Sequence, residues 1–200
     1  MSTDTLTLDH PPAREPAPRP KLLPDGVLGM ILFIFTEVML FAGMISAFVI
    51  VKSQAAGQMW PPYGQPRLPA EETAINTAAL ILSGLVLVFA QYAYKKSPKQ
   101  AVVPFGISIF LGLFFVGFQG VEWVQMLAQG LTMQSSAYGA FFYLIVGTHG
   151  IHAVGALAAM GWAFWKLTRD RLTPSAFTTV QLFWYFVVLV WPVLYWKVYL

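Results

Sequence analysis

Five long apolar segments constrain this chain more than any other feature of its sequence. Each is close to the roughly 20 residues that an α-helix needs to cross about 30 Å of hydrocarbon. Hydrocarbon offers the backbone no hydrogen bonds, so only helices or a closed β-barrel can cross it, and the period-2 alternation of barrel strands is absent. We therefore predict an all-α integral membrane protein, a five-transmembrane-helix bundle with helices at about residues 26–51, 74–94, 102–127, 138–165 and 177–199.

The amino-acid composition excludes several classes of protein and of functional site. Hydrophobic residues make up 57% of the 200 residues and charged residues only 10%, which is typical of a membrane protein and would cause a water-soluble chain to aggregate. Cysteine is absent, which excludes disulfides, thiolate metal sites and thiol nucleophiles. No run of basic residues is interleaved with aromatic residues, so nucleic-acid binding is not expected.

The first 24 residues differ from the rest of the chain. They are polar and contain closely spaced prolines, from Pro11 to Pro24, and they lack the apolar core of a signal peptide. Proline-rich polar segments stay extended and do not form a packed core. We predict a disordered Pro-rich cytoplasmic arm at residues 1–24 and a transmembrane domain at residues 25–200.

The distribution of basic residues predicts the orientation of the bundle. Five crossings place the N-terminus and the second and fourth connections on one side of the membrane. That side carries nine of the twelve Lys and Arg residues, and the other side carries only Lys52, Arg67 and Lys197. Because Lys and Arg are enriched in cytoplasmic loops, the N-terminus is expected in the cytoplasm and the C-terminus outside, in the periplasm or extracellular space.

Four ionisable residues fall inside the predicted helices: Glu37, Glu122, His149 and His152. A charged carboxylate near the centre of a bilayer costs roughly 2.5 to 3.5 kcal/mol on insertion scales. No Lys or Arg is predicted at the depth of Glu37. Its carboxyl is therefore expected to be protonated or hydrogen-bonded to a buried polar partner.

Two pairs of polar residues share helix faces. Gln119 and Glu122 are three residues apart, and so are His149 and His152, a spacing that puts each pair on one side of its helix. Imidazole and carboxylate are common metal ligands, which makes a metal site one hypothesis. The ligand set is thin, however, and interhelical hydrogen bonds satisfy buried imidazoles equally well. We favour structural polar residues and predict no metal and no catalytic residue in this chain.

Several motifs in a fixed order resemble subunit III of the haem-copper terminal oxidases. They are Phe35-Thr-Glu-Val-Met-Leu-Phe41, Trp60-Pro-Pro, Gln119-Gly-Val-Glu122, Ser136-Ala-Tyr-Gly139 and Gly147-Thr-His-Gly-Ile-His152, followed by an aromatic C-terminal helix. The resemblance covers roughly residues 25–200. It is close to the short bacterial forms with five helices, which lack the first pair of the seven-helix members.

The resemblance implies a non-redox subunit of a bacterial cytoplasmic-membrane complex that reduces O2 to water and pumps protons. The subunit would pack beside the catalytic subunit I, together with subunit II, and would also bind membrane lipids, including phospholipid. Haems and copper belong to the partner subunits, and the three histidines of this chain are too few for such centres. Glu37 would match the family's buried carboxylate linked to proton uptake or subunit stability. Gln119, Glu122, His149 and His152 would match its structural intramembrane polar residues.

The last predicted helix departs from the family pattern. Tyr185 and Val188 replace a histidine and an aspartate of the family, so two polar contacts are expected to be missing. Three functions stay open at this point. The first is an accessory subunit of a cytochrome c or quinol oxidase, the second is an accessory subunit associated with nitric oxide reductase, and the third is a stand-alone membrane transporter or enzyme.

Overall fold

The computed structural model describes residues 23–55 and 60–199, and every regular element in these residues is helical. Five α-helices are followed by one π-helical turn, η1. The bounds are α1 Asp25–Gln54, α2 Ala70–Lys96, α3 Pro98–Ala128, α4 Ala137–Leu167, α5 Pro174–Leu194 and η1 Tyr195–Tyr199.

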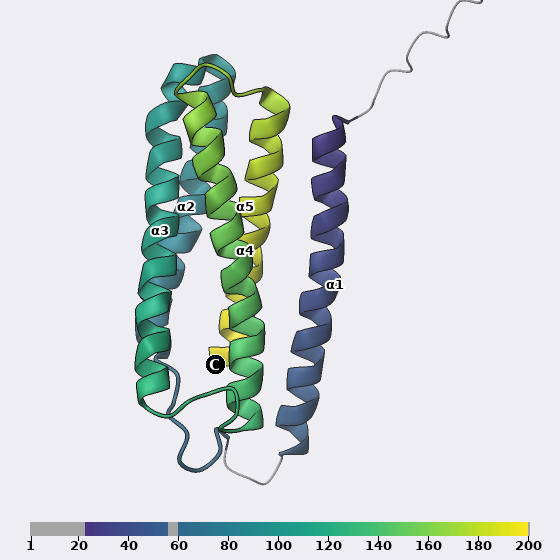
Figure 1. Cartoon of the computed structure of the whole chain (residues 1–200), viewed down its shortest axis with the longest axis vertical. Coiled ribbons are helices and arrows are strands. Elements are labelled where there is room, and N and C mark those ends of the chain that lie inside the picture. Colours follow the sequence, from purple (N-terminus) through teal and green to yellow (C-terminus); the bar gives the residue numbers. More distant parts are fainter. Residues whose placement is uncertain (1–22, 56–59, 200) are drawn as a thin grey trace, which may run out of the picture.

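The helices run along one long axis, and α1 stands at the side of the bundle (Figure 1). It packs against α5 and α4, whereas α2 and α3 form a tight hairpin joined at Ser97. Only Val27, Phe41 and Phe48 of the 30 residues of α1 are buried. The helix that carries Glu37 therefore buries fewer residues than any of the other four α-helices.

The core lies between α2, α3, α4 and α5, where two tryptophans of α5 are completely buried. The six-membered ring of Trp184 lies against Gly112 of α3, so close that a Cβ at Gly112 would stand 2.7 Å from the ring. Leu157 of α4 would be 2.8 Å from the same position. Glycine is thus required here for three helices to meet.

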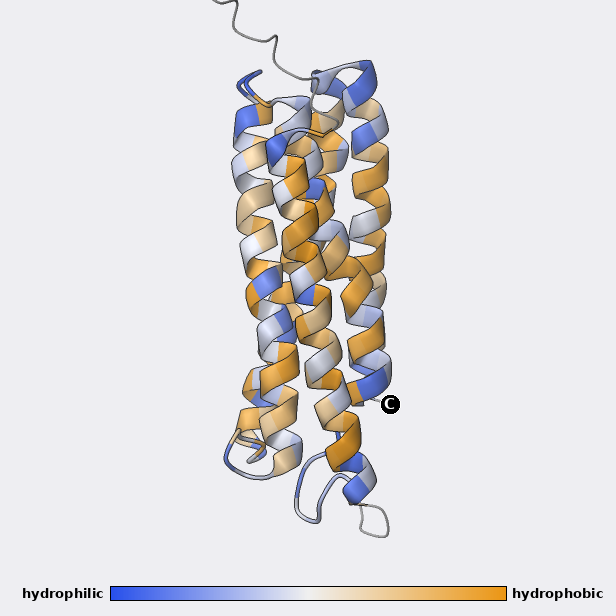
Figure 2. Cartoon of the chain, turned by 90° about the vertical axis from the view of Figure 1, so that its right-hand side faces the viewer, coloured by the Kyte–Doolittle hydropathy of each residue, from blue (hydrophilic) through white to orange (hydrophobic). Residues whose placement is uncertain are grey.

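Apolar residues predominate along the middle of the helices, and polar residues gather near the two ends of the bundle (Figure 2). Many of the apolar side chains are exposed. Ile151 is 76% exposed and Leu189 72%, although both lie in the middle of long apolar helices. All five α-helices are long and apolar enough to cross a membrane. The prediction of an all-α membrane bundle is therefore confirmed, and the protein is a multi-pass membrane protein.

The observed helix ends differ by several residues from the ends predicted from hydropathy. Helix α2 begins at Ala70 instead of residue 74, because its first turn is formed by Glu71 and Glu72, whose charge favours a helix N-terminus. Helix α5 begins at Pro174 instead of residue 177, and Thr173 caps it by accepting a hydrogen bond from the Ala176 amide. The predicted arm, residues 1–24, falls almost entirely outside the described residues.

Candidate functional site

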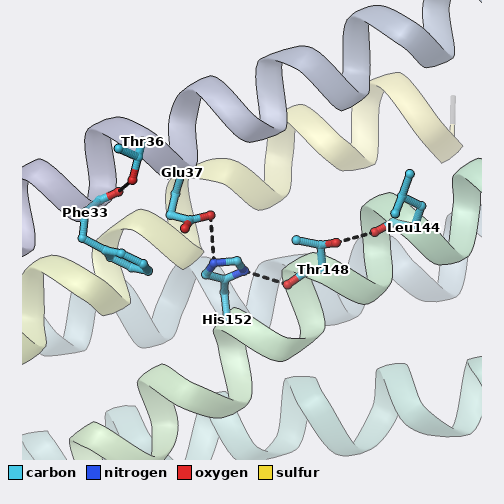
Figure 3. Close-up of polar contacts among 6 residues, drawn as sticks. All are labelled: Phe33, Thr36, Glu37, Leu144, Thr148 and His152. Carbon is cyan, nitrogen blue, oxygen red and sulfur yellow. Dashed lines mark hydrogen bonds and ion pairs between the residues drawn. The ribbon is translucent and has the colours of Figure 1, made fainter.

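Glu37 of α1 and His152 of α4 face each other where α1 packs against α4 (Figure 3). The His152 Nε2 atom lies 3.0 Å from the Glu37 Oε2 atom, and the two side chains are 13% and 15% exposed. Glu37 is the thirteenth of 30 residues in α1, and His152 is the sixteenth of 31 in α4. The two side chains therefore meet near the middle of both helices, and His152 is a buried polar partner of the kind that was one of the two alternatives expected for Glu37.

The hydrogen bonds of His152 define where protons can reside. Its Nδ1 atom lies 2.7 Å from the Thr148 carbonyl oxygen, which can only accept, so Nδ1 carries a hydrogen (Figure 3). A proton placed in the contact with Glu37 would lie either on Oε2, as a neutral acid, or on Nε2, as an imidazolium. Both arrangements have zero net charge, whereas loss of that proton would leave one negative charge at membrane depth.

Aromatic rings enclose the Glu37–His152 pair. Four phenylalanine rings lie with their centroids 5.7 to 6.4 Å from the His152 ring: Phe33, Phe41, Phe183 and Phe186. They come from α1 and α5, so three helices meet at this site. Apolar surroundings strengthen the interaction between the imidazole and the carboxyl group.

His149 lies one turn earlier on α4 and has different surroundings. Its side chain is 1% exposed and its ring lies 4.9 Å from that of Trp191, with Phe41 and Phe115 also in contact. Neither ring nitrogen has a hydrogen-bond partner within residues 23–55 and 60–199. The two histidines share a helix face, but only His152 makes the expected interhelical polar contact.

A second polar cluster surrounds Glu122 of α3. The Glu122 carboxylate accepts hydrogen bonds from the Thr73 hydroxyl of α2, at 3.0 and 3.1 Å, and from Gln119 Nε2 at 2.6 Å. Gln119 Nε2 also donates to the hydroxyl of Tyr199 in η1, at 3.1 Å. The cluster joins the outer parts of α2 and α3 to the C-terminal turn. Sequence reasoning found Gln119 and Glu122 but missed Thr73 and Tyr199.

Further polar contacts place α5 against α2. The indole nitrogen of Trp184 donates to the Ser83 hydroxyl at 3.0 Å, and that of Trp191 donates to the Thr77 hydroxyl at 2.8 Å. These bonds were not predicted, although Ser and Thr within an apolar helix are a usable signal for interhelical hydrogen bonding.

The two departures in α5 occupy apolar surroundings. Val188 packs against Gly84 of α2, where a Cβ would stand 3.0 Å from a Val188 methyl group. Tyr185 lines a groove between α1 and α5, and its hydroxyl has no hydrogen-bond partner in the described chain.

No group of three or more His, Cys, Asp or Glu side chains that could hold a metal ion occurs within residues 23–55 and 60–199. Glu37 and His152 supply two ligands, and Glu122 is engaged by Thr73 and Gln119. The Glu37–His152 contact can share a proton, and both this contact and the Glu122 cluster link neighbouring helices.

Comparisons of the sequence with known proteins identify the same family as the motifs. The family model described as cytochrome c oxidase subunit III matches residues 22–200. The probable cytochrome c oxidase subunit 3 of Mycobacterium leprae is 31% identical over 176 residues, covering 86% of each chain. Cytochrome c oxidase subunit 3 of Neurospora crassa is 33% identical over 180 residues, and that of Gallus gallus 30% over 179. The present chain spans 66% and 67% of those two proteins.

The family match covers the whole described bundle, including the Glu37–His152 pair and the Glu122 cluster, and so confirms the resemblance found in the motifs. Together, the five membrane-crossing helices and these matches show that the chain belongs to the cytochrome c oxidase subunit III family.

Proposed function

We propose that the chain is the non-redox subunit III of a respiratory haem-copper terminal oxidase in a bacterial cytoplasmic membrane. In this role it stabilises catalytic subunit I and supports proton uptake while the complex reduces O2 to water and pumps protons. The observation that carries the proposal is the Glu37–His152 pair, placed near mid-depth between α1 and α4. The similarity to oxidase subunits of Mycobacterium leprae and Nocardia farcinica, each covered over 86% of its length, supports the bacterial assignment.

The pair supports a structural role because α1 buries few of its residues. With three buried residues in a helix of 30, α1 depends on a polar contact more than the other helices do. Loss of either partner would leave the other buried and unpaired, which costs about 1 to 3 kcal/mol. The Glu37–His152 contact therefore sets the position of α1, and with it the surface that α1 presents to a partner subunit or to lipid.

The pair supports a proton role because it holds one proton that can reside on either partner. Thr148 keeps Nδ1 protonated, so Nε2 is the atom that receives the proton from Glu37 or returns it. Transfer of that proton between Glu37 and His152 leaves the net charge of the pair at zero, which suits an apolar environment. Glu37 and His152 are the residues to which we assign this exchange.

Lipid is a further partner in this proposal. A groove of about 440 Å³ lies between α1 and α5, lined by apolar side chains such as Ile34, Val38 and Leu189. Its lining matches the hydrocarbon of a phospholipid chain. Lys95 and Lys96, at the end of α2, are placed to meet anionic headgroups.

Replacement of Glu37 in the purified complex tests the proposal. We expect affinity-tagged wild-type chain to copurify with a haem-containing oxidase, and Glu37→Gln to leave the haem spectra unchanged. The variant should lose subunit III more readily, or inactivate faster during turnover, because the shared proton is lost. Glu71→Gln, which changes an exposed carboxylate at the start of α2, serves as the matched control.

The results of this copurification experiment test the oxidase assignment and the role of Glu37 separately. Copurification with a nitric oxide reductase, or transport by the isolated chain, would reject the oxidase assignment. Copurification with an oxidase, combined with unchanged subunit retention and unchanged inactivation in Glu37→Gln, would keep the assignment but remove Glu37 from it.

A further inference from the structure

The α1–α5 groove has a length that follows from the residues that line it. The lining runs from Ile34 to Ile45 on α1 and from Leu182 to Val193 on α5. Each run covers eleven residue steps, or about 16 Å along a helix axis. One leaflet contributes about half of the roughly 30 Å of hydrocarbon in a bilayer. The groove is therefore about as long as the hydrocarbon of one leaflet is thick.

The lining of the groove is apolar and open to the surrounding membrane. Tyr185 is the one lining residue with a polar side-chain atom, and its hydroxyl oxygen is buried. Val38 and Leu189 stand on opposite helices of the groove and are 48% and 72% exposed. Hydrocarbon can cover such a surface without burying any polar group that is now exposed.

Two lysines stand beyond the end of the groove at which both helices finish. Lys52 follows Ile45 by seven residues on α1, and Lys197 follows Val193 by four residues, in η1. Residues spaced by four or seven positions lie on one side of a helix, so both lysines continue the side that lines the groove. Lys197 is exposed and Lys52 is half-buried.

Both ammonium groups are available to an anion. The Nζ atom of Lys197 lies 4.5 Å from the centroid of the Trp196 ring, and that of Lys52 lies 5.9 Å from the centroid of the Phe48 ring. Neither lysine forms an ion pair with a carboxylate within residues 23–55 and 60–199. Trp196 is 65% exposed, and exposed tryptophan is typical of the membrane–water interface, where headgroups lie.

The opposite end of the groove has no such pair of lysines. There the first turn of α1 carries Asp25, and the first turn of α5, which begins at Pro174, contains no Lys or Arg. The exposed carboxylates at the lysine end, Glu71 and Glu72, belong to α2, which does not line the groove. Charge therefore selects the end of the groove that suits an anionic headgroup.

We propose that the α1–α5 groove holds one acyl chain of an anionic phospholipid, whose phosphate lies beside Lys197, with Lys52 adding to the positive charge. The acyl chain packs along the apolar lining, and the headgroup lies at the end of the bundle that carries the two lysines. The inference rests on the lipid partnership in the proposed function. It adds the charge of the headgroup, the end at which it lies and the residues that recognise it.

Headgroup selectivity provides the first test. The full chain is placed in nanodiscs of equimolar phosphatidylglycerol and phosphatidylcholine with identical acyl chains, and native mass spectrometry identifies the lipid retained after transfer to detergent. We expect the wild type to prefer phosphatidylglycerol. Lys197→Gln and Lys52→Gln should each lower this preference roughly fivefold, the effect of one lysine near a membrane surface. Arg67→Gln, which removes an exposed charge from the first connection at the same end, is the matched control and should keep it.

Filling the groove provides the second test. Ala42 is exposed and lines the groove, so Ala42→Phe places a ring where the acyl chain would lie. This variant should retain one lipid fewer than the wild type, whichever headgroup is supplied. Gly43→Phe is the matched control on the same helix, because Gly43 does not line the groove and a Cβ there meets nothing within 4 Å.

Crosslinking in the purified complex identifies the occupant. A photoreactive benzoylphenylalanine at Leu189, which lines the groove, should crosslink to phospholipid. Crosslinks to another subunit and none to lipid would overturn the inference. Equal retention of the two lipids by the wild type, or a loss of preference in Arg67→Gln as large as in Lys197→Gln, would also overturn it. Wild-type chain that retains no lipid would reject the lipid partnership as well, whereas failure to copurify with an oxidase would reject only the oxidase assignment.

Discussion

At the scale of single residues, Glu37 and His152 depend on each other: removing one of them should destabilise the protein more than removing both. Each side chain is about 85% buried and each has the other as its partner between helices. Removing one member leaves the other buried without its partner across the helix contact, and an unpaired buried polar group costs about 1 to 3 kcal/mol. Removing both leaves no orphaned group, and can be nearly neutral when the replacements are apolar.

This asymmetry predicts the result of a double-mutant cycle. His152→Leu should lower the free energy of unfolding by about 1 to 3 kcal/mol, because the Glu37 carboxyl is then buried and unpaired. Glu37→Leu combined with His152→Leu should be more stable than His152→Leu alone. Thermal melts of the four proteins in one detergent measure the coupling, and strictly additive changes would contradict it.

The sequence predicted which residues at the site are unusual, but not how they combine. Glu37, Glu122, His149 and His152 stand out because ionisable groups are rare in apolar helices. The pairing of Glu37 with His152 depends on the rotation of α1 relative to α4, and hydropathy carries no information on that angle. Thr73 and Tyr199 were missed for a related reason. Each hydrogen-bonds between elements only because Glu122 or Gln119 lies opposite it.

At the scale of elements, α5 determines the packing of the bundle. Its two buried tryptophans donate to Ser83 and Thr77, both on α2, and the ring of Trp184 also reaches Gly112 on α3. Each indole combines a large apolar surface with one satisfied donor, which suits a helix in contact with all four others. The replacement of a family aspartate by Val188 fits this arrangement, because Val188 packs directly against Gly84.

The contact of α5 with α3 predicts a large effect from one methyl group. Gly112→Ala should destabilise the bundle by about 1 to 3 kcal/mol, because the new Cβ would overlap Trp184 and Leu157. Gly117→Ala on the same helix meets nothing within 4 Å, and alanine is the better helix former, so it should be neutral or slightly stabilising. Equal melting temperatures for the two variants would show that the approach of α5 to Gly112 is looser than described.

The helices themselves were largely predictable, and their ends were not. Length and hydropathy suffice for five helices because lipid leaves the backbone no other solution. The first turn of α2 contains Glu71 and Glu72, which a search for apolar residues rejects although they favour a helix N-terminus. The π-helical turn Tyr195–Tyr199 was also missed, because it is held by the side-chain contacts of Tyr195 with Ala70 and of Tyr199 with Gln119.

At the scale of the whole molecule, the two grooves and the polar pair give the bundle distinct faces. Helix α1 is attached by a polar pair and leaves the α1–α5 groove, whose lining is apolar and suits lipid. A second groove, of about 370 Å³, lies between α3 and α4 and is lined by Gly120, Gly147 and Gly150. In the proposed function, a subunit without its own redox centre would contribute to the oxidase by holding helices and lipid in position.

Orientation is the property of the whole molecule that most directly tests the proposed location. Figure 1 places the start of α1, the α2–α3 turn and the α4–α5 connection at one end of the bundle. Among the described residues this end carries Lys95, Lys96, Lys99, Lys166, Arg169 and Arg171, whereas Lys52, Arg67 and Lys197 lie toward the other end. The excess of basic residues predicts that the first end faces the cytoplasm.

The absence of cysteine makes this orientation measurable with single cysteines introduced into an otherwise natural sequence. Tyr63→Cys, at a position 95% exposed in the first connection, should react in intact cells with a maleimide that cannot cross the membrane. Lys99→Cys, at an exposed position in the first turn of α3, should react only after the membrane is opened, because that end faces the cytoplasm. The reverse labelling pattern would invert the bundle, and it would place the basic end where anionic cytoplasmic headgroups could not reach it.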